Sequence, residues 1–245
     1  MPFLPLRRGV MLPGTVTPLP VGRERSLALV RALSKGDRFV LGVQYQPEVE
    51  EPAIADVHPL GVVAELRDKR VGGTRGTVLL VATFERVQLV SLGRSGDHWQ
   101  AEVAPVEEHN TSSLDAQTLA DALRAHLGEL ADDRTLRGIL DETRDPGLLA
   151  DRIANFIDIP AERKLEVLRA VDVEARLELV SQLLKEARAR AELREKIDSE
   201  VRRSLTDHQR EAMLRQQLRA IQKELGEGDE DGDDLSRLRE RLDQA

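Results

Sequence analysis

The feature that most constrains the fold is a long run without helix breakers. Neither glycine nor proline occurs from Val173 to Leu225, which predicts one long helix, with Asp172 as its N-cap. At about 1.5 Å per residue this helix would be roughly 80 Å long. Because that exceeds the width of a compact domain of this size, much of the helix is expected to project. Thr206 and Gln209 resemble a capping box, so a bend is expected near 205–207.

The apolar positions of this run change their spacing. They first alternate three and four residues apart, as in a short coiled-coil seam, at Leu177, Val180, Leu184, Ala187 and Ala191. They then step by four, at Leu193, Ile197, Val201 and Leu205. A sustained heptad repeat is therefore absent, and the first part is expected to pack on its own domain. A stripe returns in the last part of the run, and it is the candidate oligomer or partner seam: Met213, Leu214, Leu218, Ile221 and Leu225.

Residues 1–110 have the composition of a β-rich domain, with many β-branched residues, glycines and prolines. The segments typical of strands are Phe39–Val43, Leu60–Leu66, Val78–Val90 and His98–Val106. A hairpin turn is expected at Gly72–Thr77, and one helix at about Arg23–Leu33. Several strands at short spacing around one helix predict a small barrel or a strongly curved sheet.

Residues 111–172 are expected to form a helical bundle. One helix is predicted to start at a capping box formed by Ser112 and Asp115, and a short helix is predicted at Arg134–Thr143. Another starts at Asp145-Pro146, with Asp145 as N-cap and Pro146 at N1, and a further one starts at Pro160. The architecture is therefore α+β, a β-rich part followed by a bundle and the long helix of 173–225. Residues 226–234 predict an acidic flexible linker, and residues 235–245 the start of another helix.

Composition argues against several classes of function. There is no cysteine, which excludes disulfides, thiolate zinc sites and a cysteine nucleophile. Aromatic content is 2%, so a base-stacking nucleic-acid platform is disfavoured. Residues 1–110 carry equal numbers of acids and bases, although the first 23 residues form a small basic arm with Arg7, Arg8 and Arg23 and no acid. No apolar run approaches a membrane span, and a cytoplasmic protein is expected.

No catalytic, cofactor or metal site is predicted. The five histidines do not fall at metal-ligand spacing, and HExxH and GxSxG are absent. Gly72–Thr77 lacks the GK[ST] ending of a phosphate loop. The acidic stretch Glu48–Glu51 lies between prolines and is interpreted as a solvated turn.

The N-terminal stretch Phe3–Arg23 is the candidate binding segment. Its four prolines favour a sheet edge, which could capture an extended polypeptide by strand addition or by apolar contact. The candidate substrate-contact residues are Met11, Leu12, Pro13, Val16 and Leu19. The alternative is that Leu4, Leu6, Val16 and Leu19 belong to the barrel core.

Three segments, in order, resemble the N-terminal region of Lon proteases. PLRRGVMLPGTVTPLPVGRERSLALV (Pro5–Val30) is similar to the family's opening, in which PLR precedes an apolar, proline-punctuated VGRxxS pattern. Asp145–Leu177 resembles its helical region, with a DPxxLAD start and a DVxxRL close. REAMLRQQLRAIQKELGE (Arg210–Glu227) resembles the segment before the family's ATPase module.

The resemblance implies a PUA-like pseudo-barrel, a helical bundle and a long helix. It also implies a non-catalytic module that recognises unfolded, damaged or regulatory proteins in quality control and supports a homo-hexamer. ATP and Mg²⁺ would bind in the family's ATPase module, and a Ser–Lys dyad would cleave in its protease module. No motif of either is found here, so the expected partners are protein substrates and those two modules. The alternatives are a self-associating scaffold built on the long helix and, less favoured, nucleic-acid binding by a PUA-like fold.

Overall fold

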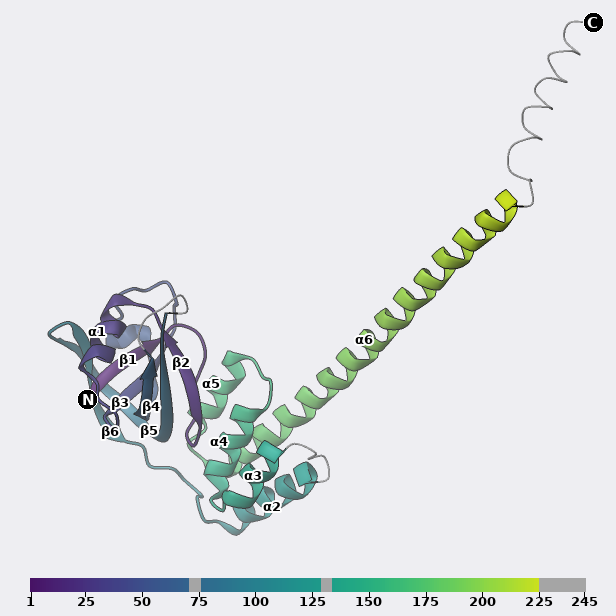
Figure 1. Cartoon of the computed structure of the whole chain (residues 1–245). Coiled ribbons are helices and arrows are strands. Elements are labelled where there is room, and N and C mark those ends of the chain that lie inside the picture. Colours follow the sequence, from purple (N-terminus) through teal and green to yellow (C-terminus); the bar gives the residue numbers. More distant parts are fainter. Residues whose placement is uncertain (71–75, 129–133, 225–245) are drawn as a thin grey trace, which may run out of the picture. The chain divides into compact units, whose positions relative to one another are not determined.

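The computed structural model describes residues 1–70, 76–128 and 134–224 (Figure 1). Its residues fall into two units, Met1–Ala187 and Arg188–Ala245, and each is described by itself. The hairpin turn expected at Gly72–Thr77 therefore lies largely outside the described residues.

Six strands form one mixed sheet. They are β1 (Pro2–Leu6), β2 (Val16–Val21), β3 (Arg38–Gln44), β4 (Val57–Arg70), β5 (Thr77–Ser95) and β6 (His98–Pro105). The order is β2-β5-β4-β3-β1-β6, and β5 also pairs with β6, so the sheet closes into a ring. One helix, α1 (Glu24–Ala32), and a short 3₁₀ turn, η1 (Ile54–Asp56), interrupt the strands. The predicted α+β class and the barrel-like sheet with one helix are confirmed.

The long strand β5 makes closure possible because it is shared. Its first half, from Thr77 to Ala82, pairs antiparallel with β2, and its second half, from Val87 to Ser95, pairs with β6. On its other side β5 pairs with β4 along most of its length. The strand β1 is parallel to β3 and antiparallel to β6. A register shift between Leu89 and Ser91 gives β5 the irregularity that lets a sheet curve.

The interior of the sheet is mostly aliphatic, with Phe3, Phe39 and Trp99 as buried aromatic residues. The apolar cluster under α1 includes Leu4, Leu29, Phe39 and Leu79, each at most 2% exposed. A second cluster contains Phe3 and Trp99. A Cβ on Gly42 would lie 2.5 Å from the Phe3 ring, so only glycine leaves room for that ring.

Four helices and the start of a fifth complete the first unit. They are α2 (Leu114–Gly128), α3 (Arg134–Glu142), α4 (Pro146–Phe156), α5 (Ala161–Arg169) and α6 (Val173–Glu224). Asp145 caps α4 as expected, since its side chain accepts the Leu148 N–H at 2.6 Å. Asp172 accepts the Ala175 N–H at the start of α6. The prediction of Ser112 as the N-cap of α2 was wrong by one residue, because the Ser113 hydroxyl accepts the Ala116 N–H at 3.0 Å.

The helices and the sheet share one apolar core. The helical cluster includes Leu149, Ile153, Val167 and Leu177, all 0–1% exposed. Val10, Leu12, Leu60 and Val62 from the β-rich part belong to the same cluster. The change in composition near residue 110 therefore marks a change of secondary structure inside one compact unit.

The second unit contains the remainder of α6. The Gly/Pro-free run forms a single helix to Glu224, as the sequence predicted. The apolar side chains of its two stripes are 50–62% exposed: Leu193, Ile197, Val201, Met213, Leu214, Leu218 and Ile221. Leu225, the expected linker 226–234 and the expected helix 235–245 lie outside the described residues, as do the side chains at the proposed bend near 205–207.

Candidate functional site

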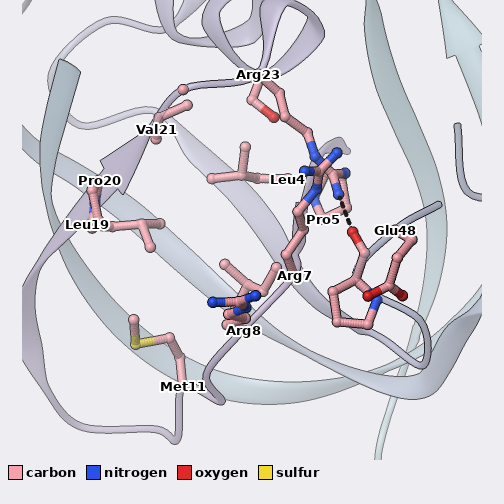
Figure 2. Close-up of a pocket in the computed structure, with 14 residues that line it drawn as sticks. Leu4, Pro5, Arg7, Arg8, Met11, Leu19, Pro20, Val21, Arg23 and Glu48 are labelled. Atoms are coloured by element: carbon pink, nitrogen blue, oxygen red, sulfur yellow. Dashed lines mark hydrogen bonds between the residues drawn. The ribbon is translucent and has the colours of Figure 1, made fainter. Parts of the chain in front are cut away.

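A cavity of about 580 Å³ opens beside β1, β2 and the start of α1. Figure 2 shows Leu4 and Leu19 directed into it, with arginines around it. Alternation along β2 buries Leu19 and Val21 and exposes Pro18 and Pro20. The cavity therefore has an apolar floor and a charged rim that consists of Arg7, Arg8, Arg23 and Glu48.

The acidic loop on this rim is held in place by arginines. Arg7 pairs with Glu50 at 2.6 Å, and Arg23 donates to the carbonyls of Pro47 and Val49 at 3.3 Å. Arg25 and Arg94 both pair with Glu51. Glu48, Glu50 and Glu51 are exposed on a turn, as the sequence predicted. Exposed ion pairs are individually weak, but several of them together hold this turn beside the cavity.

The free edge of β2 offers few hydrogen-bond donors. Among the described residues β2 pairs only with β5. The Thr83 N–H donates to the Thr15 carbonyl at 2.9 Å. By alternation, the backbone N–H and C=O groups of residues 17, 19 and 21 also point towards β5. The backbone groups of Pro18 and Pro20 then point to the free edge, where proline has no N–H to donate. This edge is therefore poorly suited to strand addition. Of the two binding modes that the sequence left open, apolar contact is the favoured one.

The structure separates the five candidate contact residues. Leu12 and Pro13 are buried, and the Leu12 carbonyl accepts the Thr83 hydroxyl at 2.7 Å. Leu19 is 7% exposed and lines the first cavity. Met11 is half-buried, and Val16 is 62% exposed. Leu12 and Pro13 therefore pack the interior and present no surface to a partner.

Val16 shares a cavity with apolar side chains that the sequence did not identify. A second cavity, of about 450 Å³, is lined by Val16, Ile139 from α3 and Phe156 from α4. Phe156 is 40% exposed, unusual for an aromatic residue on a helix whose other apolar side chains are mostly buried. A third cavity, lined by Met11 and Thr15, shares residues with both of the others. Met11, Val16, Ile139 and Phe156 are called the β2 surface below.

The main polar feature of the interior is an ion cluster. Arg86 of β5 forms two hydrogen bonds of 2.6 Å to Asp151 of α4. Arg176 of α6 contacts Asp151 at 3.1 Å and Glu108 at 2.7 Å, and Glu108 also contacts Arg86 at 3.1 Å. The side chains of Arg86, Asp151 and Arg176 are at most 2% exposed. These four groups join β5 to α4, to α6 and to the connection that follows β6.

The remaining donors of the two arginines are also satisfied. The Nε of Arg86 donates to the Leu168 carbonyl at 3.0 Å, and the Nε of Arg176 donates to the Ala170 carbonyl at 2.8 Å, both at the end of α5. Burial tends to lower the pKa of Arg86, but the contacts with Asp151 and Glu108 raise it above its ordinary value. Burial raises the pKa of the Asp151 carboxyl, against the opposing effect of the two guanidiniums. The cluster has balanced charge and a structural role.

His58 is the one histidine in the described chain that is fully buried, and its contacts are structural. Its Nδ1 accepts the Leu60 N–H at 3.1 Å, and its ring meets Tyr45 edge-on at 6.0 Å. Burial lowers the pKa of His58 below its ordinary value, with a smaller contribution from the charge of Arg169. The neutral ring is therefore the favoured form in the folded protein.

Metal ligands and membrane-spanning helices can be assessed over residues 1–70, 76–128 and 134–224. No group of three or more His, Asp or Glu side chains there is placed to hold a metal ion. Within the same ranges, no helix combines the length and the apolar character needed to cross a membrane.

Comparison with curated proteins connects the chain to one family. Lon protease 4 of Sorangium cellulosum is 42% identical to it over 248 residues, which cover 100% of this chain and 31% of that protein. Lon protease 2 of Myxococcus xanthus is 38% identical, over 100% of this chain and 30% of that protein. The chain thus spans about a third of the length of the curated relatives it matches.

Solved structures show the same fold. The N-terminal domain of the Mycobacterium avium complex Lon protease superposes with a TM-score of 0.59 at 20% identity, over 73% of this chain and 94% of that one. A family model described as the ATP-dependent protease La (LON) substrate-binding domain matches residues 1–186. The resemblance drawn from three sequence segments is confirmed, and the chain belongs to the family of Lon N-terminal substrate-binding domains.

Proposed function

We propose that this chain engages unfolded or damaged polypeptides for an ATP-dependent Lon-type protease, and that the β2 surface is where it does so. The observation that carries the proposal is the exposure of Val16 on β2, at 62%, on a cavity that the 40% exposed Phe156 also lines. Both line one cavity, and two further cavities adjoin it. Membership of a substrate-binding family supports a protein ligand.

Apolar contact provides the selectivity that such a role needs. Folded proteins bury most of their large apolar side chains, whereas unfolded chains expose them. Because Pro18 and Pro20 remove donors from the free edge of β2, backbone pairing would add little, and binding would depend on side-chain burial. A single surface of this size would bind weakly. Several copies held together would raise the effective concentration of the surface and compensate for the weak single contact.

The cleavage itself belongs to other modules in this proposal. Hydrolysis of ATP with Mg²⁺ and of the peptide bond would take place in the ATPase and protease modules of a longer Lon-type protein. The role of this chain would be to hold the substrate and, through α6, to support assembly of a homo-hexamer.

Binding to matched unfolded and folded forms of one polypeptide tests the proposal. A protein with a reducible disulfide framework, permanently unfolded by reduction and alkylation, would be compared with its native form in a titration against the full chain. The unfolded form is expected to bind and the native form is not. Equal binding of both forms, or of neither, would refute the proposal.

A second candidate function is self-association through α6. The observation that favours it is the exposure of Met213, Leu214, Leu218 and Ile221, each 55–62%, on one helix. Apolar side chains so exposed along a helix are typical of a surface that another helix covers. The two functions are compatible because they use different parts of the chain.

A further inference from the structure

We propose that the cavity between β1, β2 and the 47–50 loop binds the C-terminal residue of a polypeptide. The free α-carboxylate would contact Arg8 and Arg23, and the apolar side chain of that residue would lie on Leu19 and Met11. This inference rests on the proposed function, because it assigns one end of a protein substrate to a particular subsite.

The first observation is an unbalanced charge around an apolar floor. Arg7, Arg8 and Arg23, the basic arm of the sequence, come together on one cavity whose only acidic lining residue is Glu48. Arg7 is paired with Glu50. Arg8 and Arg23 have no carboxylate partner within the described part of the chain, since the only hydrogen bonds of Arg23 go to backbone carbonyls. The cavity therefore retains positive charge for a ligand.

The second observation concerns individual nitrogen atoms. The Nε of Arg7 and the Nε and Nη1 of Arg23 are buried without a hydrogen-bond acceptor among the described residues. Unpaired buried donors are rare because each one loses its hydration without compensation. A carboxylate provides acceptor positions on two oxygens and matches the planar guanidinium fork. An anionic group at this rim would offset the charge of guanidiniums that the protein leaves incompletely paired.

The shape and chemistry of the cavity favour a chain end over other anions. A polyphosphate or nucleic acid needs an extended basic track, whereas the acids and bases of residues 1–110 are equal in number. If an internal acidic residue bound here, the chain on both sides of it would have to leave the cavity as extended backbone. The adjoining edge of β2 gives such a chain few donors, because Pro18 and Pro20 face it. A C-terminal residue leaves in one direction only and carries its charge next to its side chain.

Two labelled peptides of the same sequence, ending in Ala-Leu-Leu, test the inference. One has a free C-terminal acid and the other a C-terminal amide, and both are titrated against the full chain by fluorescence anisotropy. The acid is expected to bind about tenfold more tightly, the effect of roughly one charge-assisted hydrogen bond. The Arg8→Gln variant should remove most of this difference between acid and amide. Arg8 is exposed and has no side-chain partner among the described residues, so the variant is expected to fold.

The control variant is Arg31→Gln, which removes the same charge from an exposed position on α1 outside the cavity. It should preserve the preference for the acid. The inference is overturned if acid and amide bind alike, if Arg31→Gln has the effect of Arg8→Gln, or if inorganic phosphate competes as well as acetyl-leucine does. The unfolded polypeptide with an amidated C-terminus separates the two proposals. If it binds while acid and amide peptides bind alike, only the subsite is refuted; if it fails to bind, the proposed function is refuted as well.

Discussion

The guanidinium of Arg86 and the carboxylate of Asp151 face each other across two hydrogen bonds of 2.6 Å, although 65 residues separate them in the chain. The first comes from β5 and the second from α4. Arg176 reaches the same carboxylate from α6. One buried acid therefore connects the sheet, a helix of the bundle and the base of the long helix.

Removal of the charge of Asp151 should strongly destabilise the first unit. In Asp151→Asn, both Arg86 and Arg176 lose a charged partner in the interior, and the expected loss is about 3–5 kcal/mol of unfolding free energy. Urea denaturation followed by circular dichroism measures it. The matched control is Asp121→Asn, which breaks an exposed pair with Arg124 on α2 and should change stability by less than about 0.5 kcal/mol. Equal effects of the two variants would show that the cluster has no special structural role.

The pH dependence of stability should contain a contribution from His58. Burial lowers the pKa of His58 in the folded protein, whereas in the unfolded chain the pKa keeps its ordinary value of about 6.5. Below about pH 6.5 the unfolded chain therefore binds a proton more readily than the folded protein does. The unfolding free energy should therefore fall as pH decreases from about 6.5 towards the lowered pKa, and His58 should add nothing above that range. His58→Gln should flatten this part of the profile. An unchanged slope in the variant would assign the effect to other groups.

Gly42 should not tolerate even one added methyl group. A Cβ there would lie 2.5 Å from the ring of Phe3 in the sheet core, so Gly42→Ala should destabilise the protein by about 1–3 kcal/mol through overpacking. Gly93→Ala is the control, because a Cβ added at that position would meet no neighbouring side chain or strand within 4 Å. Thermal unfolding of both variants measures the difference. A Gly42→Ala protein as stable as Gly93→Ala would mean that Phe3 moves aside at little cost.

The periodicities of the sequence predicted most of the fold, and contacts distant in sequence were the part that they could not predict. The absence of glycine and proline was sufficient for α6, and Asp145-Pro146 for the start of α4, because both signals are local. The ion cluster was missed although Asp151 and Arg176 lie inside the DPxxLAD and DVxxRL patterns. Nothing near either residue in the chain indicates Arg86 as the partner.

In the candidate site, too, local signals were readable from the sequence and distant contacts were not. Val16 was identified because it lies in a proline-punctuated apolar segment, and the arginines were noted as a basic arm. Their convergence on one cavity depends on the pairing of β1 with β3 and of β2 with β5. Ile139 and Phe156 come from α3 and α4, so no local signal linked them to Val16. Leu12 and Val16 have the same character in the sequence, and only the packing distinguishes them.

Self-association, if α6 provides it, should depend on the seam that contains Leu218. Leu218→Asp places a charge in that stripe and should shift the chain towards monomer in sedimentation velocity at high concentration. Leu193→Asp is the control, since Leu193 is similarly exposed, at 58% against 56%, but lies outside the seam. If the unmodified chain is monomeric at every concentration, or if both variants act alike, the seam does not drive assembly of this chain.

The most direct test of the proposed substrate surface compares two exposed valines. Val16 and Val90 both lie on strands and are 62% and 58% exposed, but only Val16 belongs to the β2 surface. Affinity for a reduced and alkylated polypeptide would be measured by titration for Val16→Asp and Val90→Asp. Val16→Asp should weaken binding about fivefold, which corresponds to about 1 kcal/mol for a partly buried valine contact, and Val90→Asp should leave it unchanged. Equal affinities of the two variants would contradict the assignment of substrate binding to the β2 surface.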